Sequence, residues 1–122
     1  MDIIMIGALM AMQNQFRVFH WQTESHAQHV AFGGAYESLD ELIDEFVEVY
    51  QGKKGALMGK QGFTVKLVNL SDDAESFIDD AIEYFRVYLP KSLDSNVDTD
   101  LLNIKDEMMA ILNQTKYRLH MM

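Results

Sequence analysis

Two histidines flank a short polar stretch and could together bind a metal ion. His20 ends a long apolar stretch, and His29 follows nine residues later, beyond the polar residues 23–27. If the chain reverses direction near residues 23–26, the two imidazoles face each other. Imidazole is a ligand for zinc, copper, nickel and Fe(II). The competing interpretation is a buried, hydrogen-bonded His20 and a His29 that merely lies on the surface.

Carboxylates provide a second candidate feature. Six acidic residues occur between positions 37 and 48, and on a helix Glu37, Asp44 and Glu48 share a strip beside the apolar face. Asp44 and Glu48 are four residues apart, a spacing at which two carboxylates can hold one metal between them. The alternative is an acidic face that is simply solvated.

The histidine pair and the carboxylate pair cannot form one site within a single helical chain. Asp44 lies fifteen residues after His29, which is about 22 Å along a helix that rises 1.5 Å per residue. Two chains packed antiparallel about a twofold axis would bring His20 and His29 of one copy to Asp44 and Glu48 of the other. Such an interface would create two equivalent sites.

Hydrophobic periodicity predicts four helices that must position these residues. Local signals support their ends: Ser25 is a plausible N-cap, Asp72 with Glu75 resembles a capping box, Pro90 ends the third helix, and Asp98 caps the fourth. The predicted helices span residues 3–22, 26–50, 72–89 and 99–119.

Each predicted helix carries an apolar stripe that we expect to face the core. The residues of these stripes are Met5, Leu9, Met12, Phe16 and His20; Phe32, Tyr36, Leu39, Ile43, Phe46 and Tyr50; Phe77, Ile78, Ile82, Phe85 and Leu89; and Leu102, Met109, Leu112 and Leu119. Gly33 and Gly34 weaken the second helix unless close packing requires them.

The connection between the second and third helices, residues 51–70, is long for a small domain and holds four glycines and four lysines. Val65, Leu67, Val68 and Leu70 suggest that its second half lies along the helices. A four-helix bundle with one long crossover is the ferritin-like arrangement. The sequence therefore predicts a single all-α domain, residues 1–122, with a ferritin-like four-helix bundle.

Composition narrows the function. The chain has 122 residues, no cysteine and a formal net charge of −9. Disulfides, thiol nucleophiles and iron–sulfur clusters are excluded, and the acidic balance makes DNA an unlikely partner. The apolar run at 3–12 has no preceding basic residues and is too short to span a membrane. We therefore expect a cytoplasmic protein without membrane association and without an organic cofactor.

His20-Trp21, His29 and the Asp44-x-x-x-Glu48 pair resemble the ferroxidase signature of the Dps proteins, the DNA-protecting miniferritins. Fourteen residues separate His29 from Asp44, as the family pattern requires. The resemblance covers roughly residues 10–51 and implies Fe(II) binding between subunits, with oxidation by peroxide or dioxygen. It implies metal ligands at His20, His29, Asp44 and Glu48, and a redox role for Trp21, whose alternative role is packing at the interface.

The chain departs from the Dps pattern in three ways. Gly33 stands where the family usually has an aspartate, so Asp40 or Glu37 would have to supply the missing carboxylate. The chain is also some forty residues shorter than usual for the family, and it lacks the lysine-rich tail that many members use on DNA. Short ferritin-like proteins of unknown function carried by bacteriophages are closer in length, and for these the compartment is the host cytoplasm.

Two hypotheses follow. In the first, the chain is a Dps-like iron-binding protein or ferroxidase that forms a homodimer or a larger shell, with iron, zinc or manganese at the shared site. In the second, it is a metal-free helical bundle that serves as a structural or interaction protein, such as one of a phage, with a degenerate site. Gly33 favours the second hypothesis, and the spacing of the four other ligand positions favours the first.

Overall fold

A computed structural model describes residues 2–57, 59, 61–71 and 73–121. In that part of the chain there are four α-helices and no β-strand. The third helix continues into a π-helical turn, η1, and a 3-10 turn, η2. The bounds are α1 Asp2–Gln22, α2 His26–Lys54, α3 Ala74–Glu83, η1 Tyr84–Tyr88, η2 Leu89–Ser92 and α4 Thr99–Leu119.

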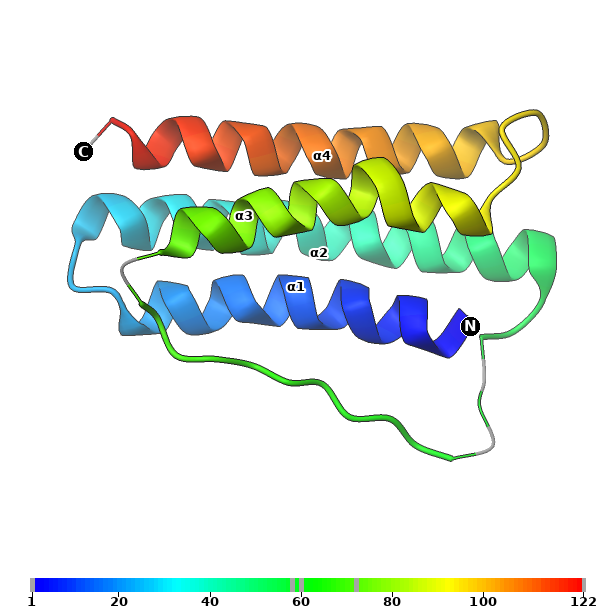
Figure 1. Cartoon of the computed structure of the whole chain (residues 1–122), viewed down its shortest axis with the longest axis horizontal. Coiled ribbons are helices and arrows are strands. Elements are labelled where there is room, and N and C mark those ends of the chain that lie inside the picture. Colours follow the sequence, from blue (N-terminus) through cyan, green and yellow to red (C-terminus); the bar gives the residue numbers. More distant parts are fainter. Residues whose placement is uncertain (1, 58, 60, 72, 122) are drawn as a thin grey trace.

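The helices lie side by side, and the long connection decides their directions (Figure 1). α1 and α2 form an antiparallel hairpin, as their short turn predicts. The connection then runs back along the whole bundle, so that α3 is parallel to α2 and α4 is parallel to α1. α2 packs against both α1 and α4, and α3 packs against α4. Within the described residues no helix is both long and apolar enough to cross a membrane.

The predicted helix starts are correct for α2 and need correction for α3. Ser25 caps α2, where its hydroxyl accepts a hydrogen bond from the Gln28 N–H at 3.3 Å. Asp72, the predicted cap of α3, lies outside the described residues. The N-cap is Asp73, whose carboxylate accepts from the Ser76 N–H at 3.1 Å. The capping pair is therefore one residue further along the chain than predicted.

Asp98 occupies the N-cap position of α4, as predicted, but its side chain makes no capping hydrogen bond there. Its carboxylate turns inward and is almost fully buried. The oxygen Oδ2 accepts from the Asp94 N–H and from Lys54 Nζ, each at 2.8 Å. Lys53 Nζ lies 3.3 Å from Oδ1. Asp98 therefore ties the α3–α4 loop to the end of α2, rather than capping α4.

These ion pairs explain why α2 is longer than predicted. The periodicity ends at Tyr50, but the helix continues to Lys54 and ends at Gly55, whose φ of 91° favours glycine. Lys53 also donates to the Val97 carbonyl at 2.8 Å and to Asp100 at 2.7 Å. The last turn of α2 is therefore held by tertiary contacts and by two cations at the negative end of the helix dipole.

The sequence predicted that Pro90 ends the third helix, but the α-helix changes its pitch before the proline instead of stopping there. The helix first widens over Tyr84–Tyr88, where the Leu89 N–H bonds to the Tyr84 carbonyl five residues back. It then tightens into the 3-10 turn Leu89–Ser92, which contains the proline. Proline lacks an N–H and its ring collides with the carbonyl four residues earlier in a regular α-helix. The change of helical pitch relieves that collision.

The core contains most of the predicted apolar residues. Phe16 and Phe19 of α1, Phe32 of α2 and Phe77 of α3 form one aromatic cluster, with ring centroids 5.3–6.2 Å apart in the contacting pairs. The structure adds two details to the prediction. His20 is half-buried at the edge of the α1 stripe while Phe19 is buried, and α4 buries further side chains besides those named from the sequence. Leu101, Ile104 and Met108 are buried beside Leu112, whereas Leu102, Met109 and Leu119 are half-buried.

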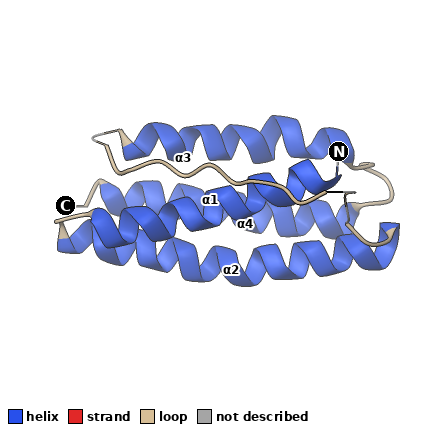
Figure 2. Cartoon of the chain, turned by 90° about the horizontal axis from the view of Figure 1, so that it is seen from below, coloured by secondary structure: helices blue, strands red, loops and turns tan. Residues whose placement is uncertain are grey.

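The second half of the connection, residues 61–71, is extended and follows α1 (Figures 1 and 2); we call it the strap. The buried side chain of Gln15 accepts from the Val68 N–H at 2.8 Å and donates to the Val68 carbonyl at 2.6 Å. Gln22, seven residues later on α1, accepts from the Leu70 N–H at 2.6 Å. Two glutamine amides thus hold the strap as a neighbouring β-strand would.

Candidate metal site at the helix hairpin

His20 and His29 lie against each other where α1 meets α2, as the predicted chain reversal requires. Their rings stack with centroids 3.8 Å apart and planes inclined by 20°. His20 Nδ1 lies 2.7 Å from the His29 carbonyl oxygen, and His29 Nδ1 lies 2.8 Å from the His20 carbonyl oxygen. We call this reciprocal arrangement the histidine clasp.

The clasp determines which ring nitrogens are available to a ligand. A carbonyl oxygen can only accept a hydrogen bond, so each Nδ1 carries the proton and donates it. The neutral imidazole then presents an unprotonated Nε2. Histidines that bind metals usually donate their other ring N–H to a carbonyl or carboxylate in this way. Both residues therefore have the tautomer that metal ligation through Nε2 requires.

The stacked rings do not converge on a single ion. A metal bonded to imidazole lies in the ring plane at about 2.0–2.1 Å from the nitrogen. The two ring planes are inclined by only 20° and their centroids are 3.8 Å apart, so the planes intersect much further from the rings than the length of a metal–nitrogen bond. In this conformation each imidazole offers a ligand to a different position, and the remaining ligands must come from elsewhere.

Gly33 has a local structural reason. A β-carbon at this position would lie 2.9 Å from both Cε1 and Nδ1 of His20. Real side chains essentially never approach so closely, so any larger residue would displace the His20 ring. The glycine that departs from the Dps pattern is thus the residue against which His20 packs, and the clasp takes the space where a side chain would lie.

Contacts between α1 and α2 define how the acidic strip lies relative to the clasp. His20 packs on Gly33, Arg17 lies over the Tyr36 ring at 4.1 Å, and Gln13 donates to Asp40 at 2.6 Å. From His20 to Arg17 to Gln13 the chain goes back by three and then four residues along α1. From Gly33 to Tyr36 to Asp40 it goes forward by the same numbers along α2. The next two equal steps place Asp44 level with Leu9 and Glu48 level with Met5.

The acidic residues predicted as ligands therefore lie well away from the clasp in the same chain. Eleven residues of α1 separate His20 from the level of Asp44, which is about 16 Å along the helix. Glu37, Asp40, Asp44 and Glu48 are all exposed. Within the described residues no three histidine or acidic side chains are grouped so that they could hold a metal ion.

Three of these carboxylates, those of Glu37, Asp44 and Glu48, are unpaired in the described part of the chain. Neither Asp44 nor Glu48 takes part in a hydrogen bond or an ion pair there. Asp40, proposed as an additional ligand, instead accepts a hydrogen bond from the buried Gln13. Asp44 and Glu48 are therefore available to a ligand outside their own chain.

Trp21 lies beside the clasp on the outer surface of the hairpin and is 68% exposed. The Arg17 guanidinium is 5.9 Å from the Trp21 ring and 4.1 Å from the Tyr36 ring. No ion pair joins Arg17 to a carboxylate within the described chain. Sequence reasoning missed Arg17, although it is the one basic residue other than His20 between residues 2 and 22. That isolation in an apolar helix was the available signal.

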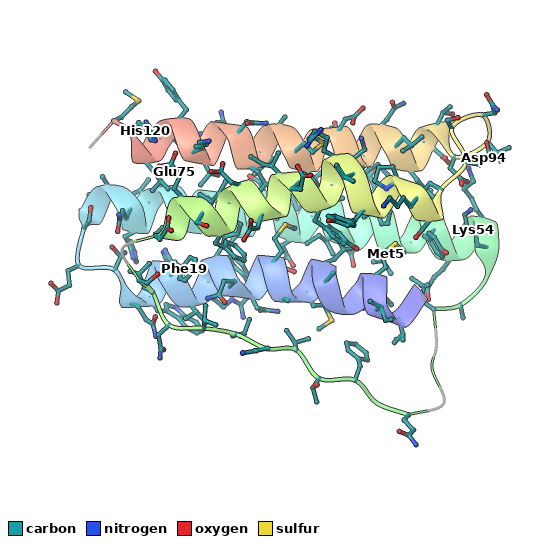
Figure 3. The ribbon with its side chains drawn as sticks, viewed as in Figure 1. Met5, Phe19, Lys54, Glu75, Asp94 and His120 are labelled. Atoms are coloured by element: carbon teal, nitrogen blue, oxygen red, sulfur yellow. The ribbon has the colours of Figure 1, made fainter. Side chains whose placement is uncertain are left out.

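His120 contacts a carboxylate, unlike His20 and His29, whose hydrogen-bond partners are carbonyl oxygens. Its Nε2 lies 3.0 Å from Glu75 Oε1, and Lys116 Nζ lies 2.8 Å from Asp79. These pairs link α4 to α3 at the end of the bundle opposite Lys54 and Asp94 (Figure 3). All four side chains are exposed to solvent by a third or more, so the pairs stabilise the fold only modestly.

The comparisons with known proteins identify a family but no activity. Residues 20–119 match the model described as "Family of unknown function (DUF5856)". Since this match covers most of the chain, the protein belongs to that family. The matched region begins at His20 and includes both histidines and the acidic strip.

A protein of Enterobacteria phage T4, described as "Uncharacterized 14.6 kDa protein in mobD-ri intergenic region", is 42% identical over 50 residues. The aligned segment is 41% of this chain and 39% of the phage protein, so the similarity covers about two fifths of each. No solved structure shows a significant match.

Proposed function

We propose that this member of the family is a Dps-like iron-binding protein in which two copies share a metal site, and that it oxidises Fe(II) there with peroxide or dioxygen. Its fold is a ferritin-like bundle, as the single crossover between α2 and α3 suggests. The observation that carries the proposal is the histidine clasp. It presents two Nε2 atoms, each backed by a carbonyl, at one end of a hairpin whose unpaired Asp44 and Glu48 lie toward the other.

An antiparallel pair of hairpins would complete the ligand set. In such a pair, a twofold axis brings the clasp of one copy to Asp44 and Glu48 of the other. This axis passes close to the Gln13–Asp40 contact, which lies about halfway along the hairpin between the clasp and these acids. The two imidazoles, which point to different positions, would then each meet carboxylate oxygens of the second copy. This geometry is the reason that the site is incomplete in one chain.

The chain's own residues would divide the chemistry. Neutral imidazole nitrogens bind the substrate Fe(II), and the anionic carboxylates stabilise Fe(III) over Fe(II), which lowers the reduction potential of the bound iron. Trp21, next to the ligand His20, is placed to lose an electron to a stray oxidant, or else to pack in the interface. In a larger shell, the exposed acids would attract further cations.

The test is aerobic Fe(II) oxidation, followed by near-ultraviolet absorbance, with His20→Ala, Asp44→Ala and the control His120→Ala. We expect wild type and the control to exceed the buffer rate and the other two to fall to it. The control removes an exposed histidine that contacts Glu75 and takes no part in the clasp. Equal rates for wild type and buffer would contradict catalysis.

The alternative is a metal-free bundle that acts as a structural or interaction protein of a phage. It is favoured by the clasp itself, because the two histidines satisfy each other's backbone carbonyls without any metal. The similarity to a phage protein supports a phage origin and a host-cytoplasmic location under either proposal. Metal analysis of untagged protein separates the two: iron or zinc in a fixed ratio to dimer supports the first, and no reproducible metal supports the second.

A further inference from the structure

The outer surface of the α1–α2 hairpin has two contrasting halves. Between residues 2 and 22, α1 carries only Asp2 and Arg17 as formally charged residues, and it exposes Ile4, Met10 and Trp21. The neighbouring α2 exposes six acids, namely Glu37, Asp40, Glu41, Asp44, Glu45 and Glu48. A helix with an apolar, solvent-exposed outer surface normally buries that surface against another protein segment or molecule.

Charge would oppose association of two such surfaces unless a cation intervenes. Each copy has a formal net charge of −9. With the axis near Gln13 and Asp40, the two Asp40 side chains would come close together at the centre. The Gln13 amide already donates to Asp40, which offsets part of that repulsion.

Arg17 is the cation in the right place. It lies four residues from the Gln13 level, so the same axis places it level with Leu9 of the second copy. On α2 of the second copy, that level is the level of Asp44, and Glu41 lies three residues before it. Its guanidinium lies against the Tyr36 and Trp21 rings and has no carboxylate partner among the described residues. Arginine, tyrosine and tryptophan are the residue types that dominate binding energy in interfaces.

We infer that Arg17, held between Tyr36 and Trp21, is the residue that docks a second copy of this chain, by pairing with Asp44 and Glu41 on α2 of that copy. This inference rests on the intersubunit arrangement proposed above and adds the contact that makes it self-complementary. Each interface contains two such pairs, one on each side of the axis, because the contact is repeated by symmetry.

The experiment measures the dimer dissociation constant by sedimentation velocity in chelator-treated buffer, for wild type, Arg17→Glu, Glu41→Lys and the double variant. Each single variant places like charges opposite each other, and we expect it to weaken the dimer by about tenfold or more. The double variant restores opposite charges, and its constant should return toward wild type. Asp44 and Glu48 stay intact in all four proteins.

Lys91→Glu is the matched control. Lys91 is also a cation over an aromatic ring, 5.1 Å from the centre of Tyr88, but it is exposed and lies at the far end of the third helix. We expect its dimer constant to equal that of wild type, and circular dichroism verifies that each variant is folded. Arg17→Gln, which removes the charge without reversing it, replaces Arg17→Glu if that variant is unfolded.

The outcomes separate this inference from the proposed function. A dimeric wild type whose Arg17 variants dimerise equally well overturns the role of Arg17 and leaves the shared metal site standing. A wild type that remains monomeric overturns both. If Arg17→Glu weakens the dimer and adding Glu41→Lys in the double variant does not restore it, the pairing of Arg17 with the acids of α2 is overturned.

Discussion

At the scale of single residues, the close contact between Gly33 and His20 has the sharpest consequence. Gly33→Ala would place a β-carbon 2.9 Å from the imidazole, and the neighbouring carbonyl contact would break as the ring moved. We expect a loss of unfolding free energy of about 1–3 kcal/mol, as for other overpacked sites. Chemical denaturation measures this loss, and the Nδ1 proton resonance of His20 reports the broken clasp.

Gly52→Ala is the control for that substitution. Gly52 is also a helical glycine of α2, but a β-carbon there meets no atom within 4 Å. Alanine should therefore stabilise the helix by about 1 kcal/mol through its higher helix propensity. A Gly33→Ala protein as stable as Gly52→Ala would show that the His20 ring does not need the space.

Asp98 predicts how stability changes in acid. The pKa of the Asp98 carboxyl is lowered from 3.8 to about 2. The main cause is the hydrogen bond that the Asp94 N–H donates to it, and the ammonium groups of Lys54 and Lys53 lower it further. A lowered folded-state pKa stabilises the fold above the unfolded value and loses that effect as pH falls through the folded value. The contribution should therefore be complete above about pH 4 and disappear toward pH 2.

The measurement is urea unfolding between pH 2 and pH 6 for wild type and Asp98→Asn. The difference in unfolding free energy should be largest at pH 6 and should shrink as the pH falls through the window. A difference that does not vary with pH would mean that the Asp98 carboxylate is not held ionised by its contacts.

At the scale of elements, the strap shows how side-chain amides can fix an irregular segment. α1 is apolar around much of its circumference, so it needs cover on more than the face toward the core. The strap supplies part of that cover, with Phe63 approaching Gly7 and Gln15 holding Val68. Its own Leu67 and Val68 remain 41% and 50% exposed. The strap is therefore attached to α1 mainly by polar contacts.

Removing one of those contacts should loosen the strap without unfolding the bundle. In Gln15→Ala the Val68 N–H and carbonyl lose their partner, but both can bond to water, so we expect a cost of about 1 kcal/mol. Hydrogen exchange at the Val68 amide should accelerate markedly. Asn14→Ala is the control, because Asn14 is an exposed neighbour on α1 that bonds only to the Met10 carbonyl. Unchanged Val68 exchange in Gln15→Ala would contradict the attachment.

At the scale of the whole molecule, the order of the helices decides what can meet. The crossover places α2 between α1 and α4, and it leaves the outer surface of the α1–α2 hairpin uncovered in one chain. A site made from the clasp and the acidic strip therefore requires a second molecule. Sedimentation of wild type should give twice the mass of one chain or a multiple of it.

The sequence by itself determined the local features. Apolar periodicity predicted all four helices, and the limits of α4 and the N-cap at Ser25 agree with the structure because these depend on neighbouring residues alone. The short polar turn was sufficient to predict that His20 meets His29. The spacing of Asp44 from His29 was sufficient to predict that the acids and the histidines lie apart in one chain.

Only the tertiary structure decided the remainder. The extension of α2 to Lys54 depends on Asp98 and Asp100, which follow more than forty residues later. The reason for Gly33 is a ring from another helix, and the tautomer of each histidine depends on the carbonyl of the other. The support of Arg17 by Tyr36 depends on how the two helices are paired. These features arise from contacts between residues distant in the chain, and local propensity carries no information about such contacts.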